Sequence, residues 1–350
     1  MSHSLSQTGP HHDIVISSRV RIARNVEEYP FPHRMETEKT QKLTQMVAEA
    51  VRAFPDDRGD QFRFIELHKT SELERMSFVE NHLISPALAE NPERGSFFLD
   101  ANNACSIMIN EEDHLRIQCM YTGLRLEEAW QEADRLDDWL GKRLSFAFDE
   151  SFGYLTACPT NAGTGVRFSA MLHLPALTMM GYVNGLIHAA SQLGFAVRGV
   201  FGEGTEYMGN LYQISNQITL GAKEQEMIHH LEDVAMQVIQ KERLARKTLL
   251  EKQPLDLQDR ICRSMGILRY ARKLSRKEAM QYLSDIKLGV ALNMISNCTL
   301  EELHDLVERI QPGNLQIHVG SPLTESERDK KRATLIRNTL AKGGVADVNE

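Results

Sequence analysis

Five arginines fall in stretches whose alternating apolar residues predict β-strands. They are Arg19, Arg21, Arg116, Arg167 and Arg198. A guanidinium on a buried strand is costly unless an anion accompanies it, and its planar fork binds phosphate oxygens through paired hydrogen bonds. The five residues are therefore candidates for a phosphate site. For any one of them alone, a solvated surface charge is the alternative interpretation.

Carboxylates form the second group that could do chemistry. Glu111, Glu112 and Asp113 are consecutive, and Glu203 stands between two glycines. Neutralising a guanidinium at pH 7 costs roughly 7 kcal/mol, so a reaction at its nitrogen needs carboxylates that align it and accept its proton. Consecutive strand residues alternate faces, so Glu112, in phase with Arg116, is predicted to point inward. A solvated acidic turn is the alternative.

A cysteine in a polar turn is the third candidate. Cys158 begins CPTNAGTG, where hydroxyl donors and nearby arginines would favour a thiolate. The thiolate could hold a cationic guanidinium or act as a nucleophile. A small buried hydrophobe is the usual alternative for a lone cysteine.

Composition and missing signatures exclude several functional classes. The 350-residue chain has a formal charge of −8, which is unlike a general nucleic-acid binder. It contains neither a GxxxxGK[ST] loop nor HExxH or CxxC spacing, so nucleotide phosphates would have to be bound by arginines and no metal site is expected. Five scattered cysteines and the lack of a long apolar run predict a cytoplasmic protein.

Hydrophobic periodicity predicts an α+β region followed by an all-helical region. Expected strands span 14–22, 62–67, 96–99, 105–119 (a hairpin or a bent strand), 166–173, 196–201 and 210–219. Expected helices span 36–53, 124–140, 175–193, 222–252, 255–274, 276–295, 300–310 and 325–341. We place the boundary near 245–255, which gives domains 14–244 and 255–341.

Four motifs, in order, resemble the catalytic domain of the phosphagen (guanidino) kinases. They are SSRVRIARN, NEEDHLRI, CPTNAGTGVR and RGVFGEGTE, within residues 14–221. The sequence is most similar to the bacterial protein arginine kinases of the McsB type. The resemblance implies a strongly curved antiparallel sheet flanked by helices, as in the glutamine synthetase catalytic domain. It also implies transfer of the γ-phosphoryl group of ATP to arginine side chains of proteins.

The resemblance also assigns roles to individual residues. The implied nucleotide site comprises Ser17, Ser18, Arg19, Val20, Arg21, His82, Arg116, Arg167, Phe168, Ser169, Ala170, Met171, Arg198, Gly199, Val200, Phe201 and Gly202. Glu112 and Glu203 match the carboxylates that bind the guanidinium, with Glu112 as the base, and Cys158 matches a reactive cysteine near the substrate. Mg2+ is expected to be held mainly through the phosphates.

The C-terminal region carries a further motif. Residues 328–333 read RDKKRA and match the RDxxRA motif of McsB-type kinases, which reads phosphoarginine as an allosteric signal. The matching residues are Arg328, Asp329, Arg332 and Ala333. Without the resemblance, this is a charged helix N-terminus. The resemblance also implies that this region pairs subunits, giving a homodimer or a higher homo-oligomer.

The start of the sequence departs from the metabolic phosphagen kinases. Those enzymes carry a helical domain before SSRVR, whereas about sixteen residues precede it here. We therefore expect an open site that accepts arginine on a protein surface. A kinase for free arginine and a non-catalytic phosphoarginine-binding adaptor are the alternatives. Partners implied by the resemblance are the CtsR repressor, an McsA-type activator and the ClpC–ClpP protease, in stress response and protein quality control, without nucleic acid or membrane.

Overall fold

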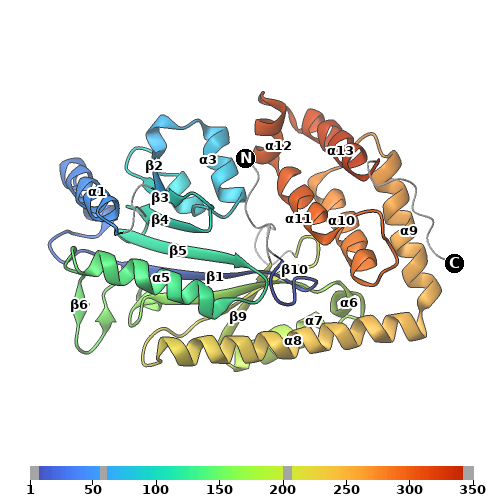
Figure 1. Ribbon diagram of the computed structural model, residues 1–350, viewed down its shortest axis with the longest axis horizontal. Helices are drawn as coiled ribbons and strands as arrows, with labels where there is room; N and C mark the ends of the chain where they lie inside the picture. The colour runs from blue at the N-terminus through green and yellow to red at the C-terminus, as the bar shows by residue number, and fades with distance from the viewer. Residues whose placement is uncertain (1–7, 56–60, 200–206, 342–350) are drawn as a thin grey trace.

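An antiparallel sheet of eight strands forms the centre of the larger region (Figure 1). The computed structural model describes residues 8–55, 61–199 and 207–341. The strands, in spatial order, are β2 (Phe62–Glu66), β3 (Ser96–Asp100), β4 (Cys105–Ile109), β5 (Leu115–Thr122), β1 (Val15–Arg24), β8 (Val166–His173), β10 (Leu211–Asn216) and β9 (Phe195–Gly199). A separate small hairpin joins β6 (Phe148–Asp149) to β7 (Gly153–Tyr154).

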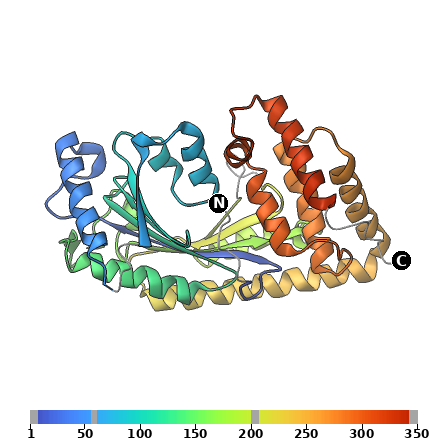
Figure 2. The same cartoon turned by 45° about the horizontal axis from the view of Figure 1, so that its top comes forward.

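Helices cover the two faces of the sheet unequally. Those of the larger region are α1 (Thr37–Arg52), α3 (Glu72–Glu80), α4 (Pro86–Ala89), α5 (Leu126–Gly141), α6 (Pro175–Met179), α7 (Val183–Gln192) and α8 (Glu224–Lys252). The smaller region consists of α9 (Pro254–Tyr270), α10 (Arg276–Ala291), α11 (Leu300–Arg309), α12 (Pro312–Val319) and α13 (Glu325–Ala341). Figure 2 shows α5 and α8 beneath the sheet, with α3 and the C-terminal helices standing on the opposite side.

Strand alternation separates a core face from a polar face. On β1, Val20 and Ile22 are fully buried in the core with α5, while Arg19 and Arg21 point to the other side. Burying each such aliphatic side chain contributes about 1.5–3 kcal/mol, so the register of the sheet is strongly specified. The alternation predicted for this strand is confirmed.

Of the two forms predicted for residues 105–119, the structure has the hairpin, in which Asn110 adopts a left-handed φ of 60° at the turn. Other predicted elements need correction. The helix expected over 175–193 is two helices, since Gly181 adopts a φ of +74° between them. Helices α3, α4 and α12 were missed, although Ser71 and Glu74 form a capping box that marks the start of α3.

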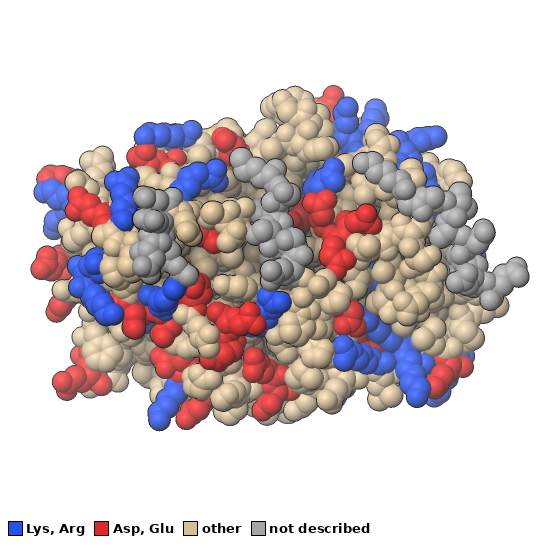
Figure 3. Space-filling view, viewed as in Figure 1, with Lys and Arg blue, Asp and Glu red and all other residues tan. Residues whose placement is uncertain are grey.

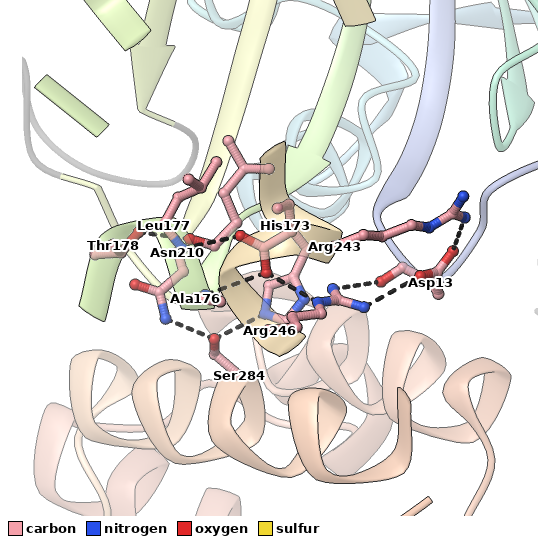
Figure 4. Close-up of polar contacts among 11 residues, drawn as sticks. Asp13, His173, Ala176, Leu177, Thr178, Asn210, Arg243, Arg246 and Ser284 are labelled. Atoms are coloured by element: carbon pink, nitrogen blue, oxygen red, sulfur yellow. Dashed lines mark hydrogen bonds and ion pairs between the residues drawn. The ribbon is translucent and has the colours of Figure 1, made fainter. Parts of the chain in front are cut away.

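Polar contacts fix the C-terminal half of α8 to the sheet region. Glu242 accepts hydrogen bonds from the backbone nitrogens of Ala176 and Leu177 at the start of α6. Arg246 bonds to Glu242 and also reaches Asp13 ahead of β1 (Figure 4). The predicted boundary at 245–255 spans the last turns of α8 and the start of α9.

Candidate active site

The register of the sheet brings the five arginines onto one face. On β1, Arg21 lies opposite Arg167 of β8, and Ala23 lies opposite Arg116 of β5. Gln213 of β10 lies opposite both Met171 of β8 and Arg198 of β9, and this continues the same face to the edge strand. Strands far apart in the sequence thus present their guanidinium groups together.

These guanidinium groups repel one another in a partly desolvated environment. Burial, with Arg167 and Arg116 nearby, lowers the pKa of Arg19 to about 10. Burial and neighbouring arginines also lower the pKa of Arg21 well below its usual value. Burial, then Arg198 and Arg116, lowers the pKa of Arg167. An anion placed among these side chains would relieve the repulsion.

Unpaired donors point to the same conclusion. Arg19 Nη2 donates to Gln213 Oε1 at 2.8 Å, and Arg167 Nη2 donates to Ser215 Oγ at 2.9 Å. The Nε atoms of Arg21 and Arg167 are buried without an acceptor in the described structure. A buried unpaired donor costs about 1–3 kcal/mol, so an oxygen-rich anion such as a phosphate fits this surface well.

The positive charge is local to this face of the sheet. Figure 3 shows acidic side chains gathered over α5 and α8, which cover the other face of the sheet. The chain as a whole carries a net charge of −8. An anionic ligand is therefore favoured at the arginine cluster and disfavoured over the helical layer.

The acidic triplet lies in the turn between β4 and β5. Arg116 Nη1 contacts Glu111 Oε1 at 2.6 Å, and its Nη2 contacts Glu112 Oε2 at 3.5 Å. Glu111 is buried and also accepts from Ser85 Oγ at 2.6 Å. The expectation that only Glu112 points inward is wrong, because residues 110–114 form a turn in which strand alternation does not apply. Sequence reasoning missed Glu111 for the same reason.

Glu112 is the more accessible of the two carboxylates. Its side chain is 44% exposed, against 3% for Glu111, so it can reach a ligand outside the sheet. Partial burial, followed by the charge of Asp113, raises its pKa, and Arg116 opposes this rise. A raised pKa suits a carboxylate that accepts a proton.

Asp113 connects the acidic turn to the segment carrying Cys158. Its Oδ1 accepts from Asn25 Nδ2 and from the backbone nitrogen of Ala157, both at 2.7 Å. Cys158 is partly exposed, and its Sγ lies 3.0 Å from Thr160 Oγ1. Asp113 therefore has a positioning role that the sequence did not reveal.

His82 lies in a pocket at the end of the arginine face. Burial and the nearby Arg19 lower its pKa to about 4, so the imidazole is neutral at pH 7. It shares this pocket with Ser17 and Met171. The structure thus places three residues of the implied nucleotide site beside one another.

Not every residue of the implied site faces this surface. The side chains of Ser18, Val20, Phe168 and Ala170 lie on the opposite face, where strand alternation packs them towards the helical layer. Gly199 ends β9, next to the exposed Arg198. Glu203 and the segment Val200, Phe201 and Gly202 lie outside the described residues. The proposed pairing of Glu112 with Glu203 therefore stays a prediction.

The C-terminal motif occupies the first turns of α13. Arg332 is 2% exposed, and it donates to the carbonyl oxygens of Ile310 and Leu274 and to Asp329 Oδ1. Arg328 is less buried and donates to the Leu323 carbonyl at 2.9 Å. Arg332 is thus engaged by protein acceptors, and the phosphoarginine role of Arg328, Asp329, Arg332 and Ala333 stays a prediction.

Metal ligation and membrane crossing are the remaining features of the described residues. Across 8–55, 61–199 and 207–341, no three His, Cys, Asp or Glu side chains come together as metal ligands. None of the helices in these ranges combines the length and apolar character needed to cross a membrane.

Comparisons with known proteins agree with the geometry of the site. Residues 42–245 match the family model for the ATP:guanido phosphotransferase C-terminal catalytic domain. Residues 254–349 match the model for the protein-arginine kinase McsB C-terminal domain. The resemblance drawn from the four motifs is therefore confirmed.

Curated relatives extend along nearly the whole chain. The protein-arginine kinase of Caldanaerobacter subterraneus subsp. tengcongensis is 46% identical over 330 residues, covering 94% of this chain and 98% of the relative. That of Brevibacillus brevis is 46% identical over 339 residues, covering 97% of this chain and 95% of the relative.

Solved structures show the fold. A duplicated taurocyamine kinase from Schistosoma mansoni, with bound transition state analog components, aligns with a TM-score of 0.61 and 26% identity, covering 69% of this chain and 35% of that one. A lombricine kinase aligns with a TM-score of 0.58 and 22% identity, covering 69% of this chain and 71% of that one. The expected guanidino kinase fold is confirmed, and the chain belongs to the protein-arginine kinase family.

Proposed function

We propose that this protein transfers the γ-phosphoryl group of ATP to arginine side chains of other proteins. The single observation that carries the proposal is the cluster of five guanidinium groups on one sheet face, with buried unpaired donors at Arg21 and Arg167 and a carboxylate turn at Arg116. Family membership supports the same reaction.

The arginines and the acidic turn have different roles in the reaction. A guanidinium nitrogen of the substrate attacks the γ-phosphorus, the N–P bond forms, the bond to the bridging oxygen breaks, and ADP leaves. The arginines neutralise charge on the transferring group. Glu112 accepts the proton from the attacking nitrogen, while Glu111 keeps Arg116 oriented.

A divalent cation would accompany the nucleotide. Mg2+ bound to phosphate oxygens would neutralise part of the negative charge of ATP. We place it on the phosphates and water, because the described residues contain no group of three His, Cys, Asp or Glu side chains that could hold a metal ion.

Phosphoarginine formation tests the proposal directly. The full chain is incubated with ATP, Mg2+ and casein, and the product is analysed by mass spectrometry with fragmentation that preserves P–N bonds. Acid-labile, base-tolerant phosphate on arginine is expected. Phosphate found only on serine, threonine or free guanidino compounds would exclude this function.

Assays with the same protein distinguish two alternative functions. A kinase for free arginine would release ADP in a coupled assay when free arginine replaces casein. A non-catalytic adaptor would retain full cellular function when Glu112 is replaced by alanine. The first outcome would shift the substrate class, and the second would remove catalysis from the biological role.

Regulation and partners form the remaining part of the proposal. We propose that phosphoarginine binds at residues 328–333, which requires Arg332 to exchange its contacts with Ile310 and Leu274 for phosphate oxygens. A CtsR-type repressor, an McsA-type activator and a ClpC–ClpP-type protease are the partners that the family resemblance suggests. Co-purification from stressed cells, with and without R332A, tests this assignment.

A further inference from the structure

A pocket lies where the polar face of the sheet meets the C-terminal helices. Its empty space amounts to about 590 Å³ when the solvent-open space at its mouth is counted. The sheet side supplies Ser17, Met120 and Met171. The opposite side is supplied by α10 and α11, through residues that include Met280, Lys287 and Val307. The pocket thus belongs to both regions of the protein.

Direct contacts hold the C-terminal helices against this pocket. Ser284 of α10 bonds to His173 Nε2 at 2.8 Å and to Asn210 Nδ2 at 2.7 Å (Figure 4). On the other side, Glu80 of α3 accepts from the backbone nitrogens of Gly313 and Asn314 at the start of α12, both at 2.8 Å. Both sides of the pocket are therefore fastened to the sheet region.

Lys287 is the unusual residue of the pocket wall. It lies one helical turn beyond Ser284, lines the pocket and is 6% exposed. Its ammonium has no hydrogen bond or ion pair among the described residues, although buried lysines are normally paired. Burial, together with the charge of Arg246, lowers its pKa to about 8. An acceptor supplied by a ligand would satisfy this group.

The pocket adjoins the Ser17 end of the arginine cluster, where the base of a nucleotide could lie while its phosphates contact the arginines. Ser17 shares a face with Arg19 and Arg21, and strand residues rise about 3.3 Å each, so Ser17 lies roughly 7 Å from Arg19 along the strand. Methionines 120 and 171 provide an apolar floor against which a planar ring can pack. A nucleotide with its phosphates on the arginines would extend its base into this pocket.

We propose that α10 and α11 form the outer wall of the nucleotide-base pocket, and that Lys287 donates a hydrogen bond to a ring nitrogen of the base. The inference rests on the proposed function, and it deepens it, because the C-terminal region then takes a direct part in binding ATP. Lys287 is a binding and specificity residue and not a catalytic one, since it lies at the base end of the site.

A binding cycle with nucleotide analogues tests the hydrogen bond. ATP, 1-deaza-ATP, 3-deaza-ATP and 7-deaza-ATP are titrated calorimetrically into the wild-type chain, Lys287→Met and the exposed control Lys277→Met of the same helix. Loss of one charged hydrogen bond weakens binding about tenfold. We expect K287M to lose about this factor for ATP, and K277M to lose nothing. One of the three deaza analogues, the one lacking the ring nitrogen that accepts from Lys287, should bind the wild type about tenfold more weakly than ATP does. The same analogue should bind K287M as tightly as ATP binds K287M.

Two results of this binding cycle would contradict the proposed role of Lys287. Equal binding of all four nucleotides to the wild type, or an analogue loss that persists unchanged in K287M, would overturn the inference. If K287M does not fold, Lys287→Gln replaces it in the same cycle. Kinetics add a second readout, because K287M should raise KM for ATP with kcat nearly unchanged.

Failure of this inference is distinguishable from failure of the proposed function. If casein arginines are phosphorylated but K287M binds all nucleotides as the wild type does, only the role of Lys287 is lost. If the analogue cycle shows coupling while no phosphoarginine forms, the base pocket stands and the reaction assignment fails.

Discussion

Buried arginines occur in both regions of the molecule, but their surroundings differ. On the sheet face, the buried Nε atoms of Arg21 and Arg167 have no acceptor within the described part of the chain, and burial and neighbouring arginines lower the pKa of both residues. In the C-terminal region, Arg332 donates to two carbonyl oxygens and to Asp329. Burial alone therefore does not mark a ligand site. The number of acceptors available inside the protein decides whether an anion meets unpaired donors or must displace existing contacts, as the proposed phosphoarginine site at Arg332 requires.

The largest expected effect follows from removing Arg21. Arg21→Met should lower kcat/KM for protein arginine phosphorylation by about 10³-fold, because one charge that stabilises the transferring phosphoryl group is lost. The melting temperature of the variant should equal or exceed that of the wild type, because the substitution removes a buried charge that neighbouring arginines repel. Steady-state kinetics and thermal unfolding measure both. Normal activity combined with a large loss of stability would reverse the assignment of Arg21.

Arg332 should behave in the opposite way. Arg332→Met leaves Asp329 and the carbonyl oxygens of Ile310 and Leu274 without their donor, so the free energy of unfolding should fall by about 3 kcal/mol. Arg328→Met is the matched control on the same helix, because the Arg328 side chain makes a single hydrogen bond among the described residues, to the Leu323 carbonyl, and it should cost under about 1 kcal/mol. Urea unfolding measures both variants. Equal losses would mean that the contacts of Arg332 are not special.

A substitution at Glu80 tests the contact between α3 of the larger region and α12 of the C-terminal region. Glu80→Ala removes both acceptors for the first turn of α12, so we expect a loss of about 1–2 kcal/mol and faster amide exchange at Gly313 and Asn314. Hydrogen-exchange mass spectrometry reports the local effect. Unchanged exchange at these two amides would show that α12 is held by its apolar contacts.

The smallest expected effect concerns pH. Glu112 must be deprotonated to accept a proton, and its pKa is raised by partial burial and by Asp113. Activity should therefore be present above this raised pKa and be lost as pH falls through it. Asp113→Asn removes one of the three causes that raise the pKa, which are burial, Asp113 and Glu111. The acidic limb of kcat should therefore move to lower pH by less than about one unit. A limb that does not move would indicate that another group controls it.

The strand patterns predicted a large part of the sheet face. Alternation in 14–22 placed Arg19 and Arg21 opposite Val20 and Ile22, and the structure confirms this. The four ordered motifs led to the family, which the comparisons confirm. Local alternation succeeds here because a strand buried on one face leaves its polar residues on the other.

Local patterns failed where the chain turns. Glu111 and Glu112 both reach Arg116, because their segment is a turn and not a continuous strand. Gly181 interrupts what reads as one helix, and α12 begins at Pro312 directly after α11. In these places, side-chain direction depends on backbone angles that a hydrophobic pattern does not encode.

The sequence by itself determined the family, the two regions and the arginines that share strand faces, because these follow from motifs and from the period of a strand. Only the tertiary structure decided which arginines find acceptors. It also decided that Lys287 of the C-terminal region lines a pocket on the sheet. The physical reason is that hydrogen-bond satisfaction and desolvation depend on neighbours that are distant in the chain, such as Ile310 for Arg332 and Ser215 for Arg167.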